Sequence, residues 1–122
     1  MIRAAALLVA VIALGGCAGT LTVTEGPKVV SAHPLPSYQV HEECFKLGDG
    51  DRVDFAFESS EPVDFNIHYH EGQAVVMPIS REKSRSDAGI YVARIAQDYC
   101  LMWEAGAAGA LINYRIQIRR AA

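Results

Sequence analysis

The eight residues Val63–His70, VDFNIHYH, decide the fold class of this chain. Apolar and polar side chains alternate here without a break, so in a strand every second side chain would lie on the same face. A segment with one apolar and one polar face is typical of an antiparallel sheet that covers a core on one side. We therefore predict a strand with Phe65 and Ile67 in the core and the polar side chains on the opposite face.

The same period of two recurs on both sides of this stretch, and no segment after residue 37 has the periodicity of an amphipathic helix. Turn residues such as Gly48–Asp51 and Ser59–Pro62 separate the alternating segments, and the charged stretch Ser80–Ala88 is expected to be a loop. Strands at this spacing predict an all-β fold, a single antiparallel β-sandwich of about seven to eight strands. The predicted strands cover residues 38–47, 52–58, 63–70, 74–79, 89–95, 98–104 and 111–118.

The N-terminus has the pattern of a bacterial secretory signal. Arg3 precedes an unbroken apolar run over residues 4–14, which is too short for a membrane-spanning helix of about 20 residues. The run ends in Leu14-Gly15-Gly16-Cys17, which resembles the lipobox of bacterial lipoproteins, where the cysteine is lipidated and becomes the first residue after cleavage. The alternative is an ordinary signal peptide in which Cys17 occurs by chance.

The lipoprotein resemblance implies three regions. Residues 1–16 are the signal peptide, residues 17–37 are the lipidated N-terminus and a flexible tether, and residues 38–122 are the β-sandwich domain. Cys17 then carries a thioether-linked diacylglycerol and an acylated, palmitate-type amine, which together give stable membrane anchoring. Ala18 rather than Asp follows Cys17, which in a Gram-negative host implies the outer membrane, facing the periplasm. Alternatively, residues 21–24 form a short edge strand within the tether.

The two other cysteines, Cys44 and Cys100, predict a disulfide bond. An exported domain occupies an oxidising compartment, where an even pair of cysteines tends to join. Closing the long loop between them would stabilise the fold by about 4 kcal/mol on chain entropy. The alternative is two buried free thiols.

The order of the strands and cysteines resembles the GOLD domain of secretory-pathway cargo receptors, a β-sandwich. The resemblance covers about residues 38–119 and implies the same pairing of Cys44 with Cys100. Glu104 stands where that family usually has Asn, and a lipid would replace the receptors' transmembrane anchor, so the resemblance implies the fold and not cargo sorting. It is carried by Glu43-Cys44-Phe45, Gly89–Ala93, Tyr99–Trp103 and Ile112–Ile116.

The stretch His68-Tyr69-His70-Glu71 is the candidate metal site. Two imidazoles at positions i and i+2 project from the same side of a strand, and a His-x-His pair can supply two nitrogen ligands to copper or zinc. Glu71 is the third tentative ligand, and Asp64, Met77 or His41 would have to complete the set. The alternative is a solvated polar face of the strand. His33 is read as a tether residue.

No nucleophile constellation or phosphate-binding loop is present, which predicts that the chain is not an enzyme and uses no cofactor. The formal net charge of −3 argues against nucleic acid as a partner. We therefore expect a non-catalytic, lipid-anchored module of the cell envelope that binds an envelope protein or a small ligand. The alternatives are a copper- or zinc-binding lipoprotein that uses His68 and His70, and a purely structural envelope protein.

Overall fold

The computed structural model describes residues 26–122, so the signal peptide, Cys17 and the first part of the tether lie outside the described residues. The described chain consists of six β-strands, and no helix in it is long and apolar enough to cross a membrane. The strands are β1 (Lys28–Leu35), β2 (Val40–Leu47), β3 (Arg52–Glu71), β4 (Ala74–Val92), β5 (Gln97–Ala105) and β6 (Ala110–Arg119).

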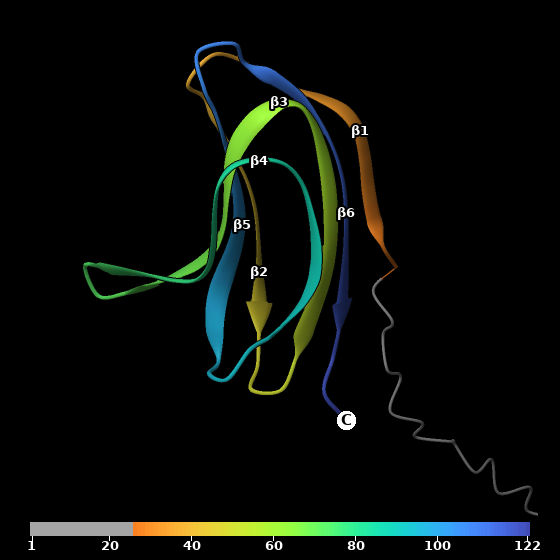
Figure 1. The fold of residues 1–122 in the computed structure, drawn as a ribbon. Coiled ribbons are helices and arrows are strands. Elements are labelled where there is room, and N and C mark those ends of the chain that lie inside the picture. Colours follow the sequence, from red (N-terminus) through yellow and green to blue (C-terminus); the bar gives the residue numbers. More distant parts are fainter. Residues whose placement is uncertain (1–25) are drawn as a thin grey trace, which may run out of the picture.

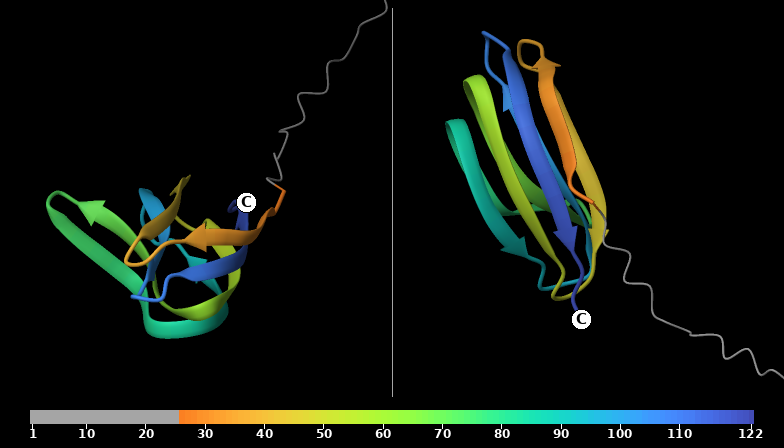
Figure 2. Two further views of the ribbon diagram at one scale, coloured as in Figure 1. Left: turned by 90° about the horizontal axis from the view of Figure 1, so that it is seen from above. Right: turned by 90° about the vertical axis from the view of Figure 1, so that its right-hand side faces the viewer.

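The strands form one antiparallel sheet that curls so that its two halves face each other (Figures 1 and 2). The strand order is β1-β6-β3-β5-β2, and β4 pairs with the other side of β3. The long strand β3 belongs to both halves, because residues 52–59 pair with β6 and residues 63–69 pair with β5. The predicted all-β, sandwich-type fold is confirmed, and the bend in β3 is what creates its two layers.

The predicted number of strands was too high, because two expected interruptions lie within strands. Ser59–Pro62, expected to be a turn, lies within β3, and Ser80–Ala88, expected to be a loop, lies within β4. The pairing of β3 with β4 has register shifts between Glu58 and Phe65, so both strands bend there without ending. Charged side chains are compatible with a strand at this position because β4 is at the edge of the sheet and they point into solvent.

β1 lies in the segment that the sequence assigned to the tether. It pairs with β6 at the edge of the sheet, where Pro34 is tolerated, and it buries Leu35 at 3% exposure. The pairing shifts between Val30 and His33, and Ala32 has a positive φ of 51°. This irregular strand lacks a clean alternation of apolar and polar residues, so its sequence resembles that of a tether.

The core lies between the two halves of the sheet. Trp103 on β5 stacks on Tyr114 on β6 with ring centroids 4.6 Å apart, although these strands are not neighbours in the sheet. The ring of Phe65 lies 5.5 Å from that of Trp103, and Tyr99 and Leu101 are fully buried, as expected for these core positions. The other buried apolar residues are Leu35, Leu47, Val53, Phe55, Phe57, Val63, Ile67, Ala93, Ala105, Ile112 and Ile116.

The predicted disulfide bond between Cys44 and Cys100 is present, with an S–S distance of 2.06 Å. The two cysteines are directly opposite each other on β2 and β5. Their neighbours Tyr99 and Leu101 point into the core, so the sulfur atoms lie on the outer face of the sheet. The bond thereby attaches the edge strand β2 covalently to its only neighbour in the sheet order.

Candidate binding surface

Two turns meet at the end of the molecule opposite the C-terminus (Figures 1 and 2). These are Pro36–Gln39, between β1 and β2, and Gly106–Gly109, between β5 and β6; we call them the distal turns. The backbone N–H of Tyr38 donates to the carbonyl oxygen of Gly106 at 3.1 Å, and that of Ala105 donates to the carbonyl oxygen of Gln39 at 3.0 Å. The two turns therefore hold each other in place.

Tyr38 combines backbone strain with exposure. Its φ is 58°, in the left-handed region that costs a non-glycine residue about 1 kcal/mol or more, and the residue is 68% exposed. Val40 and Leu111, at the same end of the strands, are about half exposed. The distal turns thus present an aromatic ring to solvent from a backbone that is held by hydrogen bonds, and the adjoining strand ends add two aliphatic side chains.

Gly109 makes the close contact between the two turns possible. Its φ is +67°, and a Cβ atom at this position would lie 2.9 Å from the carbonyl oxygen of Leu35 and 3.3 Å from the backbone nitrogen of Ser37. The N–H of Gly109 also donates to Gly106 at 3.1 Å. Only glycine fits both the left-handed backbone and this approach.

Below the distal turns, β1 and β2 are the two ends of the sheet order, and polar side chains bridge the seam between them. Glu43 is in the centre, because it accepts hydrogen bonds from Lys28 Nζ at 2.6 Å and from Tyr114 Oη at 2.7 Å. His41 Nε2 lies 2.8 Å from Tyr114 Oη, and the His41 ring is 4.0 Å from that of His33. We call Lys28, His33, His41, Glu43 and Tyr114 the seam network.

The seam network has a defined proton arrangement. The Tyr114 hydroxyl has one proton and donates it to Glu43, so His41 Nε2 must donate to Tyr114. Burial opposes the ionisation of Glu43, but the hydrogen bonds from Lys28 and Tyr114 outweigh it and hold the pKa of this carboxyl below its usual value. Burial and the acceptor Glu43 raise the pKa of Tyr114, and burial together with the neighbouring His33 lowers the pKa of His41.

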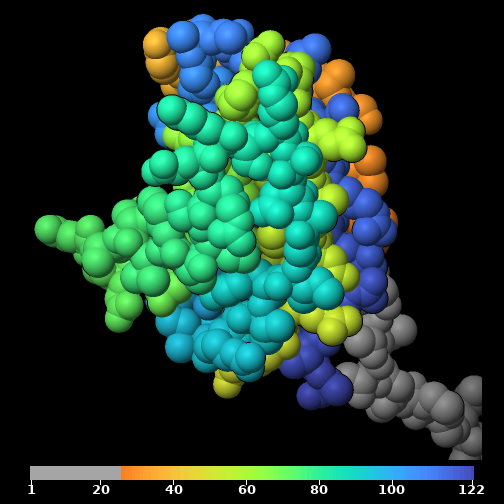
Figure 3. Space-filling view, in the orientation of Figure 1, coloured from red at the N-terminus to blue at the C-terminus, as the bar shows by residue number. Residues whose placement is uncertain are grey.

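The predicted histidine pair is on the outer face of β3, opposite Phe65 and Ile67, with the rings of His68 and His70 5.3 Å apart. The two histidines differ in environment. His68 is 4% exposed, and its Nδ1 is hydrogen-bonded to Asn66 Oδ1 at 2.7 Å. His70 and Glu71 are exposed on the hairpin between β3 and β4, which projects from the body of the molecule (Figures 1 and 3).

The described residues do not gather three ligands around this pair. Within residues 26–122, the one group of three His, Cys, Asp or Glu side chains with ligand atoms all within 4.8 Å of one another is Glu42, Cys44 and Cys100. The two sulfur atoms of that group form the disulfide and so are not thiolate ligands. Glu42 lies 3.5 Å from His68 Nε2, and burial lowers the pKa of His68 more than Glu42 raises it.

The other residues named as possible ligands lie elsewhere. His41 belongs to the seam network, and Met77 is exposed on β4. The seam network was not predicted from the sequence, because His33 was assigned to the tether. One signal for it was present: His41 and Glu43 are two residues apart and therefore share a face of β2, opposite to that of Cys44.

Comparisons with known proteins show similarity of fold. No protein-family model matches the chain, and no curated protein sequence matches it significantly. The solved structure of Aeromonas hydrophila PliG, a periplasmic inhibitor of g-type lysozyme, matches 76% of this chain and 86% of its own with a TM-score of 0.59 and 10% identity. A protein of Sulfurospirillum deleyianum matches 80% of this chain and 99% of its own, with a TM-score of 0.46 and 8% identity. The chain is therefore similar to PliG in fold, and at this identity in fold alone.

Proposed function

We propose that this chain is a non-catalytic, lipid-anchored binding module of the cell envelope that engages a protein partner through its distal turns. The observation that carries the proposal is Tyr38. A glycine would satisfy the same turn without strain, yet the position holds a large aromatic ring that the fold leaves in solvent. Strained backbone that the fold does not need is concentrated at functional sites, and tyrosine is enriched among residues that dominate binding energy.

The composition of the distal turns favours a protein partner over a small molecule. Neither turn contains a charged residue, and the seam network beneath them braces β1 against β2. Both turns line a hollow of about 400 Å³, but the exposed Tyr38 is not part of its lining. A rigid, uncharged surface with an aromatic ring resembles the centre of a protein interface, where charged residues are depleted.

The proposed anchor would place this surface away from the membrane. β1 begins towards the end of the molecule that carries the C-terminus and runs to the distal turns (Figure 1). A chain held by a lipid on Cys17 would therefore present Tyr38 to the periplasm, from the outer membrane in a Gram-negative host. We also propose that the domain is a GOLD-like β-sandwich, as its order of strands and cysteines suggests. A β-sandwich on a lipid anchor suits a binding module.

A narrower candidate is inhibition of a lysozyme. PliG, which shares the fold, is a periplasmic inhibitor of g-type lysozyme. The full chain in detergent should then lower the rate at which a g-type lysozyme clears a bacterial cell suspension. An unchanged clearing rate at molar excess removes this candidate and leaves the broader proposal standing.

The substitution Tyr38→Gly tests the binding surface. It removes the ring and relieves the left-handed strain, so the fold should become more stable by about 1 kcal/mol while binding is lost. We expect chemical cross-linking in intact envelopes to capture a partner with the natural chain and not with Tyr38→Gly. Urea unfolding measures the stability of the two chains.

Tyr38→Phe is the matched control, because it keeps the aromatic ring and the strain and should keep the partner. Val75→Gly removes an exposed apolar side chain from the β3–β4 hairpin and should also leave capture intact. Equal capture of the partner by Tyr38→Gly and by the natural chain would refute the role of the distal turns. Robust hydrolytic activity of the purified chain would refute the non-catalytic function.

A further inference from the structure

β4 is the outermost strand of the sheet half that contains β6 and β1, and its far edge is open in the described part of the chain (Figure 2, right). An open strand edge presents unpaired N–H and C=O groups and can pair with another chain. Proteins usually protect such edges with charges, bulges or proline. We propose that two copies of this chain pair antiparallel through the β4 edge at Ala88–Val92.

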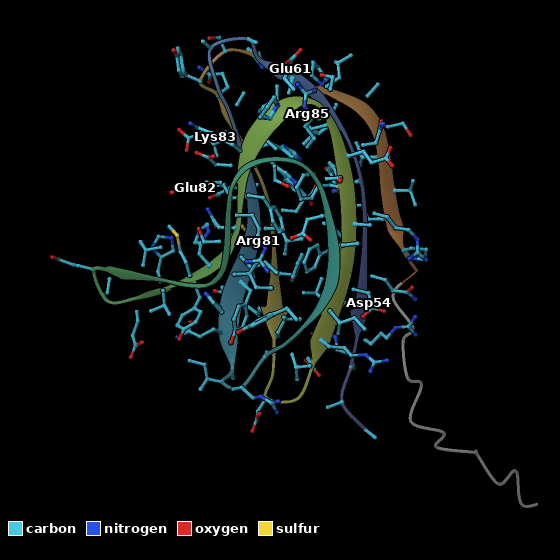
Figure 4. The ribbon with its side chains drawn as sticks, in the orientation of Figure 1. Asp54, Glu61, Arg81, Glu82, Lys83 and Arg85 are labelled. Carbon is cyan, nitrogen blue, oxygen red and sulfur yellow. A yellow bond between two sulfur atoms is a disulfide. The ribbon has the colours of Figure 1, made fainter. Side chains whose placement is uncertain are left out.

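Protection of the β4 edge is confined to one part of the strand. Arg81, Glu82, Lys83 and Arg85 lie on that part, where β4 bends (Figure 4), and Lys83 has a positive φ of 48°. The register of β4 with β3 shifts repeatedly there. By contrast, Ser86–Val92 pairs with β3 without interruption, and residues 88–93 contain no charge and no proline.

The unprotected part of β4 presents an apolar row on the outer face. Ile90 is 60% exposed, and Ala88 on the same face is also exposed, whereas Tyr91 packs against the core. Gly89 faces inwards, since a Cβ there would lie 3.1 Å from the Phe55 ring. Large exposed apolar side chains on a regular strand edge favour contact with another apolar strand.

This row is self-complementary about Ile90. In an antiparallel pair with its two-fold axis at Ile90, the two Ile90 side chains lie next to each other, and Ala88 of each copy lies opposite Val92 of the other. The larger valine of one copy would thus lie beside the small alanine of the other at both ends of the row, and for this reason we favour a second copy over an unrelated strand.

Among the other strand edges of the described chain, the hairpin part of β4 exposes Val75 and Met77 but is interrupted by Pro78 and a register shift. β1 and β2 face each other across the seam, where Lys28 and Glu43 form an ion pair at 2.6 Å. Asp54 and Arg52 are the neighbours of Ile90 and Val92 on β3, and Asp54 forms ion pairs with Arg119 at 2.6 Å and with Arg52 at 3.9 Å.

Cysteines introduced one at a time into the full-length chain in detergent test the pairing. Directly opposed residues of an antiparallel pair have Cα atoms about 4.5–5.5 Å apart, within the range of a disulfide bond. We expect Ile90→Cys to give a covalent dimer under mild oxidation, seen on non-reducing gels. Val29→Cys is the matched control, because Val29 is similarly exposed at 63% but lies on β1 at the other side of this sheet half, and it should stay monomeric.

A charged side chain at Ile90, on the two-fold axis of the proposed dimer, provides a second test. Ile90→Lys places two ammonium groups opposite each other and should weaken dimerisation in detergent by about tenfold or more, whereas Val29→Lys should not. No dimer with folded Ile90→Cys, equal dimer with Val29→Cys, or a cross-link to a different protein would overturn the pairing of two copies. Tyr38→Gly should still dimerise, so failure of the binding proposal and failure of this one are distinguishable.

Discussion

At the scale of single residues, the seam network shows how titratable groups take their properties from their neighbours. Glu43 is held ionised by donors from two other strands, Lys28 and Tyr114, and Tyr114 is kept protonated by the same contact. Burial of His41 in this network and of His68 on the opposite face lowers the pKa of both imidazoles. Both histidines therefore favour the neutral form in the folded chain.

This lowering makes the folded state sensitive to mild acid. The unfolded chain binds protons at His41 and His68 with the ordinary pKa of 6.5, while the folded chain binds protons at these two residues only at lower pH. The stabilisation is complete above the unfolded pKa and is lost as the pH falls through the folded pKa. We expect the free energy of unfolding in urea to be lower at about pH 5.5 than at about pH 7.5.

The variants His41→Gln and His68→Gln should each reduce this dependence on pH, because one titrating imidazole is removed. Val75→Gln is the control, since Val75 is exposed on the projecting hairpin and carries no titrating group, and it should leave the dependence unchanged. The same free energy of unfolding at both pH values would contradict the prediction. The carboxyls with lowered pKa, Glu43 and Asp51, titrate below this range and do not affect the comparison.

At the scale of elements, β3 and β4 illustrate why charge and proline did not end a strand. β3 keeps β4 as a neighbour on one side throughout, while its other side changes from β6 to β5. The change of neighbour occurs around Ser59–Pro62, where the sequence predicted a turn. A strand that is paired on both sides can bend at a bulge and continue, whereas a turn would break its pairing with β4.

The disulfide adds a covalent constraint to β2, which has only β5 beside it in the sheet order. Replacing both cysteines, Cys44→Ala with Cys100→Ala, should lower the free energy of unfolding by about 4 kcal/mol, because the unfolded chain gains the freedom of a long loop. Thermal melting with and without reductant measures this. The natural chain should lose stability on reduction and the double variant should not respond; equal melting temperatures of the natural chain in both buffers would contradict the prediction.

At the scale of the whole molecule, the proposed binding surface and the proposed lipid anchor belong to different parts of the chain. The distal turns form one end of the sheet, and the proposed lipid would be attached to the segment that precedes β1. The predicted signal peptide, Cys17 and residues 17–25 lie outside the described residues, so the anchor remains a prediction from the lipobox. The similarity to PliG concerns the curled sheet and not the anchor.

Cys17→Ser tests the anchor directly. If Cys17 carries the lipid, this variant should lack the mass of the acyl chains and should leave the membrane fraction or stay uncleaved. Mass spectrometry of the intact protein and fractionation of the envelope measure both effects. A natural chain without lipid mass, or unchanged membrane partitioning of Cys17→Ser, would show that the lipobox is not used.

The sequence by itself determined the all-β class, the core faces around Phe65, Ile67 and Trp103, and the pairing of Cys44 with Cys100. These features follow from alternation with a period of two and from the number of cysteines, which are readable without knowing which strands are neighbours. The placement of His68 and His70 on one face of β3 also follows from this alternation.

Only the tertiary structure decided that Lys28–Leu35 is a strand, that β3 bends between two layers, and that the seam network forms. The hydrogen bond between Glu43 and Tyr114 joins residues 71 positions apart, and it exists only because the curl of the sheet brings β2 opposite β6. Local patterns specify which face of a strand is apolar. They do not specify the register and curvature of the sheet, which depend on packing between residues distant in sequence.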